Sequence, residues 1–471
     1  MIQVRGANRF IDGPITPTLA RFALPLLTTN FLHALTGTWG AVWVSHVLGA
    51  NALTAVTTAN VIMFMMLAGV MGIGTAAGVA IGQSLGANDP QAVKRVVGCA
   101  MACVMVFSVL FAVGCWLLAP SIIASIGTPL EARDYAITHL RFTGLSMLSI
   151  FNFIVMLMMM RGSGDARTPF KFTLVWIALT LLLGPLLLTG AWGLPKLGIA
   201  GLGVGSLLAN GVALLLLVAY VYVQRLPIAL HGDDIRHLRP DPVLASLLLR
   251  RGLPMAMEGI VTQGAYFVLL GLVNGYGAAT TAAYSGAAQL WTFVQMPANA
   301  MAASMSAMVA INIGAGRWDR VEQIAWRGCG LSLALATAVT GLMYALGDIP
   351  LRLVIPEGGP VLEAARRINF IALWGWISLS LSVGLFAVVR ANGAMLAPTL
   401  LFGIAMWGFR VPFAVWLKPW LGDASIFWSF PFGSICAALL AIAYYRWGGW
   451  RSRALMLAEL NAPPDDTRVG E

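Results

Sequence analysis

Twelve long runs of apolar residues, separated by short polar stretches, dominate the sequence. Each run has at least about 20 residues, the length that a helix needs to cross a bilayer. The runs are too long and too evenly apolar for the strands of a membrane barrel. The pattern predicts an all-α integral membrane protein with twelve transmembrane helices. The predicted helices cover residues 19–45, 53–80, 97–119, 138–160, 169–191, 198–224, 253–274, 280–308, 325–347, 366–389, 397–417 and 424–446.

The basic residues of the polar stretches predict an orientation. With the N-terminus in the cytoplasm, 21 of the 29 Lys and Arg residues lie inside and 8 lie outside. Basic residues concentrate in cytoplasmic loops of membrane proteins. We therefore expect a multi-pass protein of the inner (plasma) membrane with both termini cytoplasmic.

The two halves of the chain resemble each other. Leu-Pro at 24–25 recurs at 253–254, and R-x-x-G-x-x-x-x-P recurs from Arg161 to Arg390, both at a spacing of 229 residues. Gly49-Ala50 recurs as Gly277-Ala278, and Gly86-Ala87 as Gly314-Ala315, both at a spacing of 228. Six helices per half make the repeat parallel, as in many transporters. The prediction is two pseudo-symmetric six-helix bundles.

Domain boundaries follow from this repeat. The prediction comprises an N-terminal lobe at 1–224, a cytoplasmic linker at 225–252, a C-terminal lobe at 253–446 and a cytoplasmic tail at 447–471.

Composition excludes several function classes. Hydrophobic residues make up 59% of the chain and charged residues 10%, against roughly a quarter charged in soluble domains. The net charge of +10 reflects cytoplasmic loops rather than nucleic-acid binding. No Walker loop, zinc-protease motif or C-x-x-C is present. We expect no enzyme, no cofactor, no metal site and inert thiols at all five cysteines.

Glu258 is the main candidate for ion coupling. It lies inside the seventh predicted helix, one turn after Pro254, whereas the other acidic residues lie in tails, loops or segment ends. An ionised acid is costly in a membrane and usually faces a cavity or a partner. The alternative is a glutamate near the membrane end that reaches water, since Arg251 is about two turns away.

His33, in the first helix, is the second candidate for ion coupling, because histidine titrates near neutral pH. A hydrogen-bonded structural histidine is the alternative. Pro25 and Pro254 are candidate hinges, because proline removes a backbone hydrogen bond.

Polar and aromatic side chains within the predicted helices are candidates for a substrate cavity, although most such groups join helices or fill cores. Arg141 and Arg410 are expected near the outer interface rather than in the pathway. The candidate cavity residues are Asn30, Thr262, Gln263, Tyr266, Gln289, Trp291 and Gln295.

Four strings carry a resemblance to a known family: WVSHVLGANALTAV at 43–56, IGQSLGANDPQAVKR at 81–95, RGSGDARTPF at 161–170 and INIGAGRWDR at 311–320. With these strings in this order, nearly the whole chain resembles the multidrug and toxic compound extrusion (MATE) transporters, of the MOP flippase superfamily. The resemblance implies twelve helices in two lobes around a V-shaped cavity. It also implies antiport of organic cations or other amphipathic compounds against H+ or Na+.

The chain departs from the family at several acidic positions. Gly40 and Gly184 stand where many members have Asp, and residues 370–389 contain no acid. The family's glutamate in the seventh helix corresponds to Thr262, one turn after Glu258. H+ and Na+ therefore both remain open as the coupling ion.

The sequence supports a secondary active multidrug or organic cation efflux antiporter, coupled through Glu258 and His33. A flippase for lipids or lipid-linked precursors, which needs a basic cavity, is the alternative. A non-transporting membrane scaffold is a third. The expected partners are membrane lipid, a small organic cation and H+ or Na+, with the protein as a monomer.

Overall fold

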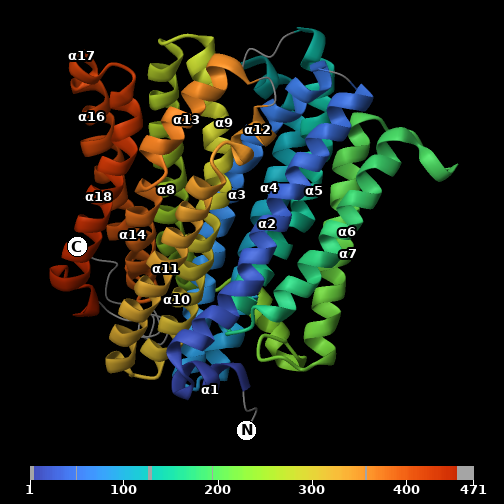
Figure 1. Ribbon diagram of the computed structural model, residues 1–471. Helices are drawn as coiled ribbons and strands as arrows, with labels where there is room; N and C mark the ends of the chain where they lie inside the picture. Colours follow the sequence, from blue (N-terminus) through green and yellow to red (C-terminus); the bar gives the residue numbers. More distant parts are fainter. Residues whose placement is uncertain (1–4, 49, 126–129, 194, 356–357, 453–471) are drawn as a thin grey trace, which may run out of the picture. The chain divides into compact units, whose positions relative to one another are not determined.

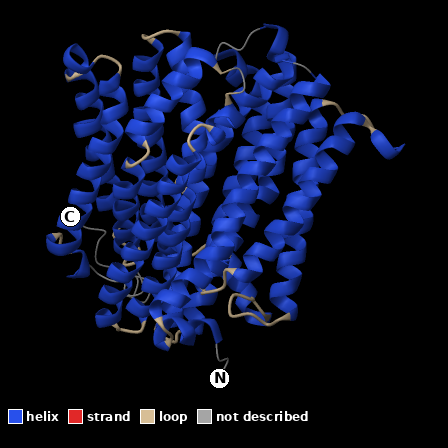
Figure 2. Cartoon of the chain, viewed as in Figure 1, coloured by secondary structure: helices blue, strands red, loops and turns tan. Residues whose placement is uncertain are grey.

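Helices form all the regular secondary structure in the parts of the chain that the structure describes (Figures 1 and 2). This computed structural model describes residues 5–452 except 49, 126–129, 194 and 356–357. The predicted tail beyond residue 452 and the repeat position Gly49 therefore lie outside the described residues.

Each of the six predicted apolar segments of the N-terminal half coincides with one long helix. A short helix, α1 (Arg5–Asp12), precedes them, and η1 (Ala191–Gly193) joins the last two. The long helices are α2 (Ile15–Leu48), α3 (Ala50–Gly86), α4 (Pro90–Ser125), α5 (Leu130–Gly162), α6 (Arg167–Thr189) and α7 (Ile199–Val223).

The C-terminal half is helical at the predicted places but more interrupted. Its spanning segments are α8 (Pro242–Asn274), α9 (Ala278–Val294) with α10 (Met296–Gly314), α11 (Trp318–Leu346), α13 (Gly359–Ala372) with α14 (Gly375–Arg390), α15 (Leu396–Gly403) with η3 (Ile404–Arg410) and α16 (Val411–Trp416), and α18 (Ala424–Trp447). The short elements are η2 (Gly232–Leu238), α12 (Ile349–Val354), α17 (Lys418–Leu421) and η4 (Trp450–Ser452).

Three segments predicted as single helices are broken. The segment 280–308 divides at Gln295, and Pro297 lies in the first turn of α10. The segment 366–389 bends by 47° between α13 and α14. The segment 397–417 contains the π-helical turn η3. By length and hydropathy, nine helices of the described chain qualify as membrane spans, or ten with the bent pair.

The internal repeat is visible in the backbone. Asn88 (φ 58°) and Gly316 (φ 70°), which end the turns after α3 and α10, are 228 residues apart. Gly164 (φ 87°) and Gly393 (φ 94°), in the turns after α5 and α14, are 229 residues apart. The left-handed conformation is uncommon and favours Gly and Asn. Because this conformation recurs at the repeat spacing, equivalent turns of the two halves have the same backbone conformation.

Contacts group the chain into two units that cut across the predicted lobes. Unit 1 contains Thr28–Ala256, and unit 2 contains Asn8–Leu27 together with the described residues from Met257 onward. The exchange points lie two residues after Pro25 in α2 and two residues after Pro254 in α8. Each of these helices thus contributes to both units.

Specific contacts hold each exchanged segment in its unit. In unit 2, the Asn312 amide donates to the Phe10 carbonyl at 3.1 Å, and the Ser304 hydroxyl donates to the Leu19 carbonyl at 3.0 Å. In unit 1, α8 packs so closely on α3 that a Cβ on Gly252 would lie 2.8 Å from the Gly72 carbonyl carbon.

Polar contacts place the linker at the end of unit 1 where α3 turns into α4. Lys94 pairs with Asp234 of η2 at 2.8 Å, and Arg95 pairs with Asp241 at 3.5 Å. The Lys94 hydrogen bond holds the pKa of Asp234 below its usual value. The helix α8 begins at Pro242, inside the predicted linker.

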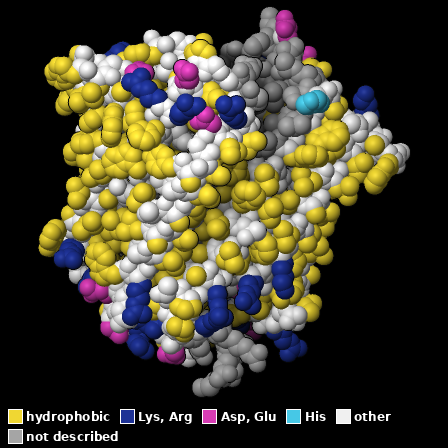
Figure 3. All heavy atoms as spheres, viewed as in Figure 1, with side chains coloured by type: hydrophobic (Ala, Val, Ile, Leu, Met, Phe, Trp, Pro, Cys, Tyr) yellow, Lys and Arg dark blue, Asp and Glu magenta, His cyan; other side chains and the backbone are white. Residues whose placement is uncertain are grey.

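The surface agrees with a membrane environment. In the view of Figure 3, hydrophobic side chains cover the middle of the helices, and Lys and Arg side chains gather toward helix ends. Charged side chains are costly in the lipid interior and stay near water, whereas apolar side chains can contact lipid tails without such a cost.

Candidate functional site

Glu258 is held by two side chains from the following spans of unit 2. Arg390 Nη2 donates to Glu258 Oε1 at 2.7 Å and to Oε2 at 2.5 Å. The Thr399 hydroxyl donates to Oε2 at 3.2 Å. The Glu258 side chain is 21% exposed and that of Arg390 is 14% exposed. Burial makes the pair costly to break, because one unpaired charge would remain in a poorly hydrated place.

The partners of Glu258 define its depth. Arg390 is the last residue of α14, and Thr399 lies in the first turn of α15. Glu258 is therefore level with the turn that joins these helices, although it lies at the middle of the 33-residue helix α8. The first half of α8 extends past that turn. At this position Glu258 is paired with a cation.

The repeat places a second arginine at the same point of unit 1. Arg161, at the end of α5, corresponds to Arg390, and Thr29 corresponds to Glu258. Arg161 Nε is buried without a hydrogen-bond partner, and its charge acts on His33. The acid of unit 2 thus has no acidic counterpart at this position in unit 1.

His33 is exposed on α2, and its ring lies 4.5 Å from that of Trp176 on α6. Asn30, one turn earlier, is partly buried. A Cβ at Gly40 or at Gly184, the two positions where the resemblance to MATE transporters implies Asp, would meet nothing within 4 Å. These two positions have room for the acid that they lack.

Three of the predicted cavity residues follow Glu258 along α8. The Thr262 hydroxyl donates to the Glu258 backbone carbonyl at 2.7 Å, so it is already used within the helix. Gln263 is exposed. Tyr266 is partly buried and stacks on Tyr284 with ring centroids 6.1 Å apart.

The remaining three candidates, on α9 and at its C-terminal end, have different surroundings. Trp291 is 6% exposed and lies in the interior of unit 2, where its indole N–H donates to Asn369 Oδ1 at 3.0 Å. Its ring stacks on Phe430 at 5.8 Å. Gln289 is exposed, and Gln295 is partly buried at the break between α9 and α10. Trp291 is thus a core residue in this conformation.

Arg410, which the sequence analysis expected near the outer interface, is partly buried and lies among aromatic side chains. It ends the π-helical turn η3, and its guanidinium carbon lies 4.9 Å from the centroid of the Phe430 ring. The Tyr284 phenol lies beside it, and its Nε has no hydrogen-bond partner. No acid pairs with it among the described residues. The sequence shows that Arg410 lies inside an apolar segment. It could not show the aromatic neighbours of Arg410, because they come from helices distant in the sequence.

Comparison with known proteins finds a family model and relatives that match this chain. The MatE family model matches residues 25–186 and 254–416, two stretches at the spacing of the internal repeat. "Probable multidrug resistance protein YoeA" of Bacillus subtilis (strain 168) is 29% identical over 440 residues, covering 93% of this chain and 95% of the relative.

Two solved structures show the same fold. A MATE protein in complex with MaL6 superposes with a TM-score of 0.87 at 18% identity, covering 95% of this chain and 100% of the other. A MOP superfamily transporter from Pyrococcus furiosus gives a TM-score of 0.86 at 18% identity, covering 96% and 99%. For that Pyrococcus transporter, a binding pocket of reverse polarity suggests a different function.

Proposed function

Because this chain belongs to the MatE family of multi-pass membrane transporters, we propose that it is a secondary active exporter of organic cations and other amphipathic compounds. The names of its multidrug resistance relatives support this assignment. An H+ or Na+ gradient supplies the energy, and the two lobes expose the substrate site alternately to each side of the membrane.

The observation that carries the coupling proposal is the pairing of Glu258 with Arg390 and Thr399. While Glu258 is ionised, it neutralises Arg390 and ties α8 to the turn between α14 and α15. When Glu258 binds a proton, the attraction is lost and the charge of Arg390 is exposed. The two protonation states therefore favour different arrangements of these helices, which is the differential affinity that a coupled switch requires.

The hinge proposal rests on the same helix. Pro254 lies one turn before Glu258, and the exchange point of α8 between the units lies between them. Pro25 holds the matching place in α2. We assign bending to these prolines, because each removes a hydrogen bond from its helix.

We propose a substrate site with fewer residues than the sequence suggested, without the buried Trp291 and without Thr262, whose hydroxyl is bonded within α8. Asn30, Gln263, Gln289, Gln295 and Tyr266 retain exposed or partly exposed polar groups. His33 remains the second proposed proton site, because its ring is exposed and an imidazole nitrogen can accept a proton.

The test is transport of a fluorescent organic cation into proteoliposomes under an imposed pH gradient. Native protein and Glu363→Gln, an exposed acid on α13, should transport with the same pH dependence. Glu258→Gln should fold, by its melting temperature, but lose coupled transport. Arg390→Gln should alter the pH dependence, because it removes the side chain that binds the Glu258 carboxylate.

Equal transport by native protein and Glu258→Gln would move ion coupling to another site. A sodium gradient that drives native transport where the pH gradient does not would assign Na+ as the coupling ion.

A second candidate function is favoured by Arg410, a partly buried cation that forms no ion pair with an acid in the described chain. Such a group attracts the phosphate of a lipid or lipid-linked precursor, as a flippase requires. Scrambling of headgroup-labelled phospholipid by native protein, lost in Arg410→Gln, would favour this function over cation export.

A further inference from the structure

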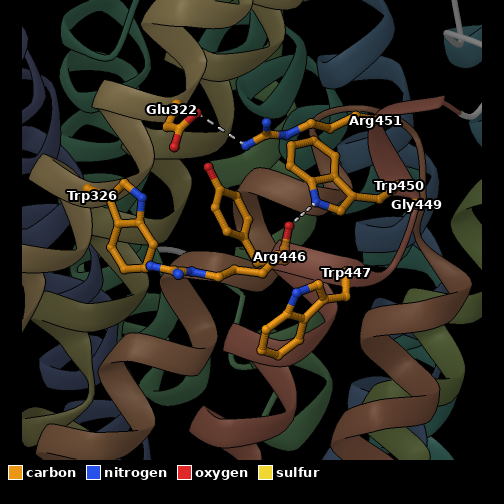
Figure 4. A pocket seen from close by; sticks show the side chains of 8 residues that line it. Glu322, Trp326, Arg446, Trp447, Gly449, Trp450 and Arg451 are labelled. Atoms are coloured by element: carbon orange, nitrogen blue, oxygen red, sulfur yellow. Dashed lines mark hydrogen bonds and ion pairs between the residues drawn. The ribbon is translucent and has the colours of Figure 1, made fainter.

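A pocket of about 410 Å³ lies in unit 2 where α18 ends, beside the first turns of α11 (Figure 4). Its walls come from α11, from the end of α18 and from η4. It shares no residue with the candidate site around Glu258. Both α11 and α18 are membrane spans, so the pocket lies where spans leave the apolar core.

The pocket carries a surplus of positive charge. Arg446 and Arg451 line it together with a single acid, Glu322. Arg451 pairs with Glu322 at 3.5 Å, and no ion pair involves Arg446 among the described residues (Figure 4). One arginine charge is therefore left for an anion.

Both guanidinium groups lie over the faces of aromatic rings. Arg446 lies 5.7 Å from the Trp326 ring centroid, and Arg451 lies 5.6 Å from that of Tyr445 and 5.5 Å from that of Trp450. A guanidinium stacked on rings keeps the N–H groups at its edge for an acceptor. Paired edges of this kind match the oxygens of a phosphate.

A tight turn and internal hydrogen bonds hold the wall of the pocket in place. Gly449 (φ 61°) turns the chain back after α18, so that Trp450 reaches the interior. The Trp450 indole donates to the Tyr445 carbonyl at 2.8 Å, and the Asn392 amide donates to the Trp450 carbonyl at 2.6 Å. These bonds fix the position of Arg451.

A buried hydroxyl in the pocket wall is also available. Tyr445 is 2% exposed, and its hydroxyl lies near Arg451 but has no partner in hydrogen-bonding geometry. A buried hydroxyl without a partner is costly, and an acceptor oxygen would satisfy it.

An apolar track leads from the pocket along α18. Phe432, Ile435 and Leu439 are exposed, and with Arg446 they follow each other at helical spacings of three, four and seven residues. Exposed apolar side chains on a spanning helix face lipid tails. Trp447, which is 78% exposed, adds an indole of the kind that concentrates at headgroup depth.

From this arrangement we propose that the pocket binds the phosphate headgroup of one anionic phospholipid, with the acyl chains along the Phe432–Arg446 face of α18. Arg446 and Arg451 bind the phosphate, Tyr445 donates to it, and Trp447 covers the glycerol region. This site is independent of the proposed export function, because its test requires no transport.

The test is native mass spectrometry of the full chain in detergent with added dioleoylphosphatidylglycerol or dioleoylphosphatidylcholine. Native protein should retain phosphatidylglycerol preferentially. Arg446→Gln and Arg451→Gln should each weaken its binding about fivefold, the effect expected for one basic group at a membrane surface. Glu322→Gln should strengthen it about fivefold, because it removes the acid that competes for Arg451.

Arg327→Gln is the matched control, because this exposed arginine lies on the same helix outside the pocket lining. It should leave retention unchanged. Equal retention of phosphatidylcholine, or equal losses in Arg327→Gln and Arg446→Gln, would overturn the site. Displacement of the lipid by inorganic phosphate at equal concentration would assign the pocket to a free anion instead. The opposite shift in Glu322→Gln keeps the test decisive if the arginine variants fold poorly.

Discussion

Single polar side chains in this protein are explained by their partners rather than by their positions in the sequence. Glu258 is bound to Arg390, and the indole of Trp291 is bound to Asn369. Both pairs join residues from separate helices, so no local pattern could reveal them. Arg390 was nevertheless visible in the sequence as part of the repeated R-x-x-G-x-x-x-x-P motif, and its position at the end of a helix follows from that motif.

Trp291→Phe should lower the stability of unit 2. The substitution keeps most of the ring but leaves Asn369 Oδ1 without its donor, which costs about 1–3 kcal/mol. Thermal unfolding in detergent measures the loss. Trp420→Phe, at an 80% exposed tryptophan, is the control and should unfold at the native temperature. A native melting temperature for Trp291→Phe would contradict the structural role assigned to this residue.

Arg410→Met should not destabilise the protein. A charge among apolar side chains without an acidic partner is costly. Replacing it with an apolar side chain of similar size should therefore be neutral or stabilising by about 1–4 kcal/mol. The lost contact with Phe430 offsets about 0.5–2 kcal/mol of this gain. The melting temperature should therefore be equal to or above the native value. A clear decrease would show that Arg410 has a stabilising anionic partner.

The positions of the helices were predicted from the sequence more completely than any other feature. All twelve predicted segments coincide with helices, because apolar runs of this length have one stable form in a bilayer. The breaks at Gln295, between α13 and α14, and in η3 were not predicted. They depend on packing: a Cβ on Gly375, at the start of α14, would lie 2.9 Å from the Phe430 ring.

Gly252→Ala should weaken the docking of α8 on α3. The added Cβ would lie 2.8 Å from the carbonyl carbon of Gly72, so the backbones must separate, at a cost of about 1–3 kcal/mol. Gly114→Ala on α4 is the control, since its Cβ meets nothing within 4 Å. That variant should be neutral or more stable by up to about 1 kcal/mol. Thermal unfolding of both variants checks the difference, and equal behaviour would argue against a close contact.

The whole molecule is organised by its internal repeat. The turns at Asn88 and Gly316, and at Gly164 and Gly393, have the same unusual backbone at the repeat spacing. The family match divides at the same spacing. The units defined by contacts differ from the predicted lobes because Asn8–Leu27 groups with the C-terminal half and the predicted linker groups with the N-terminal half. The exchanges within α2 and α8 lie beside equivalent prolines.

The orientation of the whole molecule is testable by labelling with a membrane-impermeant maleimide, in a background without the native cysteines. Asp233→Cys, in the exposed linker, should react only after the cells are permeabilised. Trp192→Cys, at the 83% exposed turn between α6 and α7, should react in intact cells. The reverse result would place the linker outside and invert the predicted topology.

The sequence by itself determined the membrane class, the places of the helices, the twofold repeat and the resemblance to MATE transporters. These properties depend on composition and periodicity, which are local, and on spacing, which the chain records directly. Only the tertiary structure decided that Glu258 is paired, that Trp291 is buried, that Arg410 lies among aromatic rings and that two arginines share a pocket at the end of α18. Each of these depends on side chains from helices far apart in sequence, and a polar group in an apolar environment takes its properties from such neighbours.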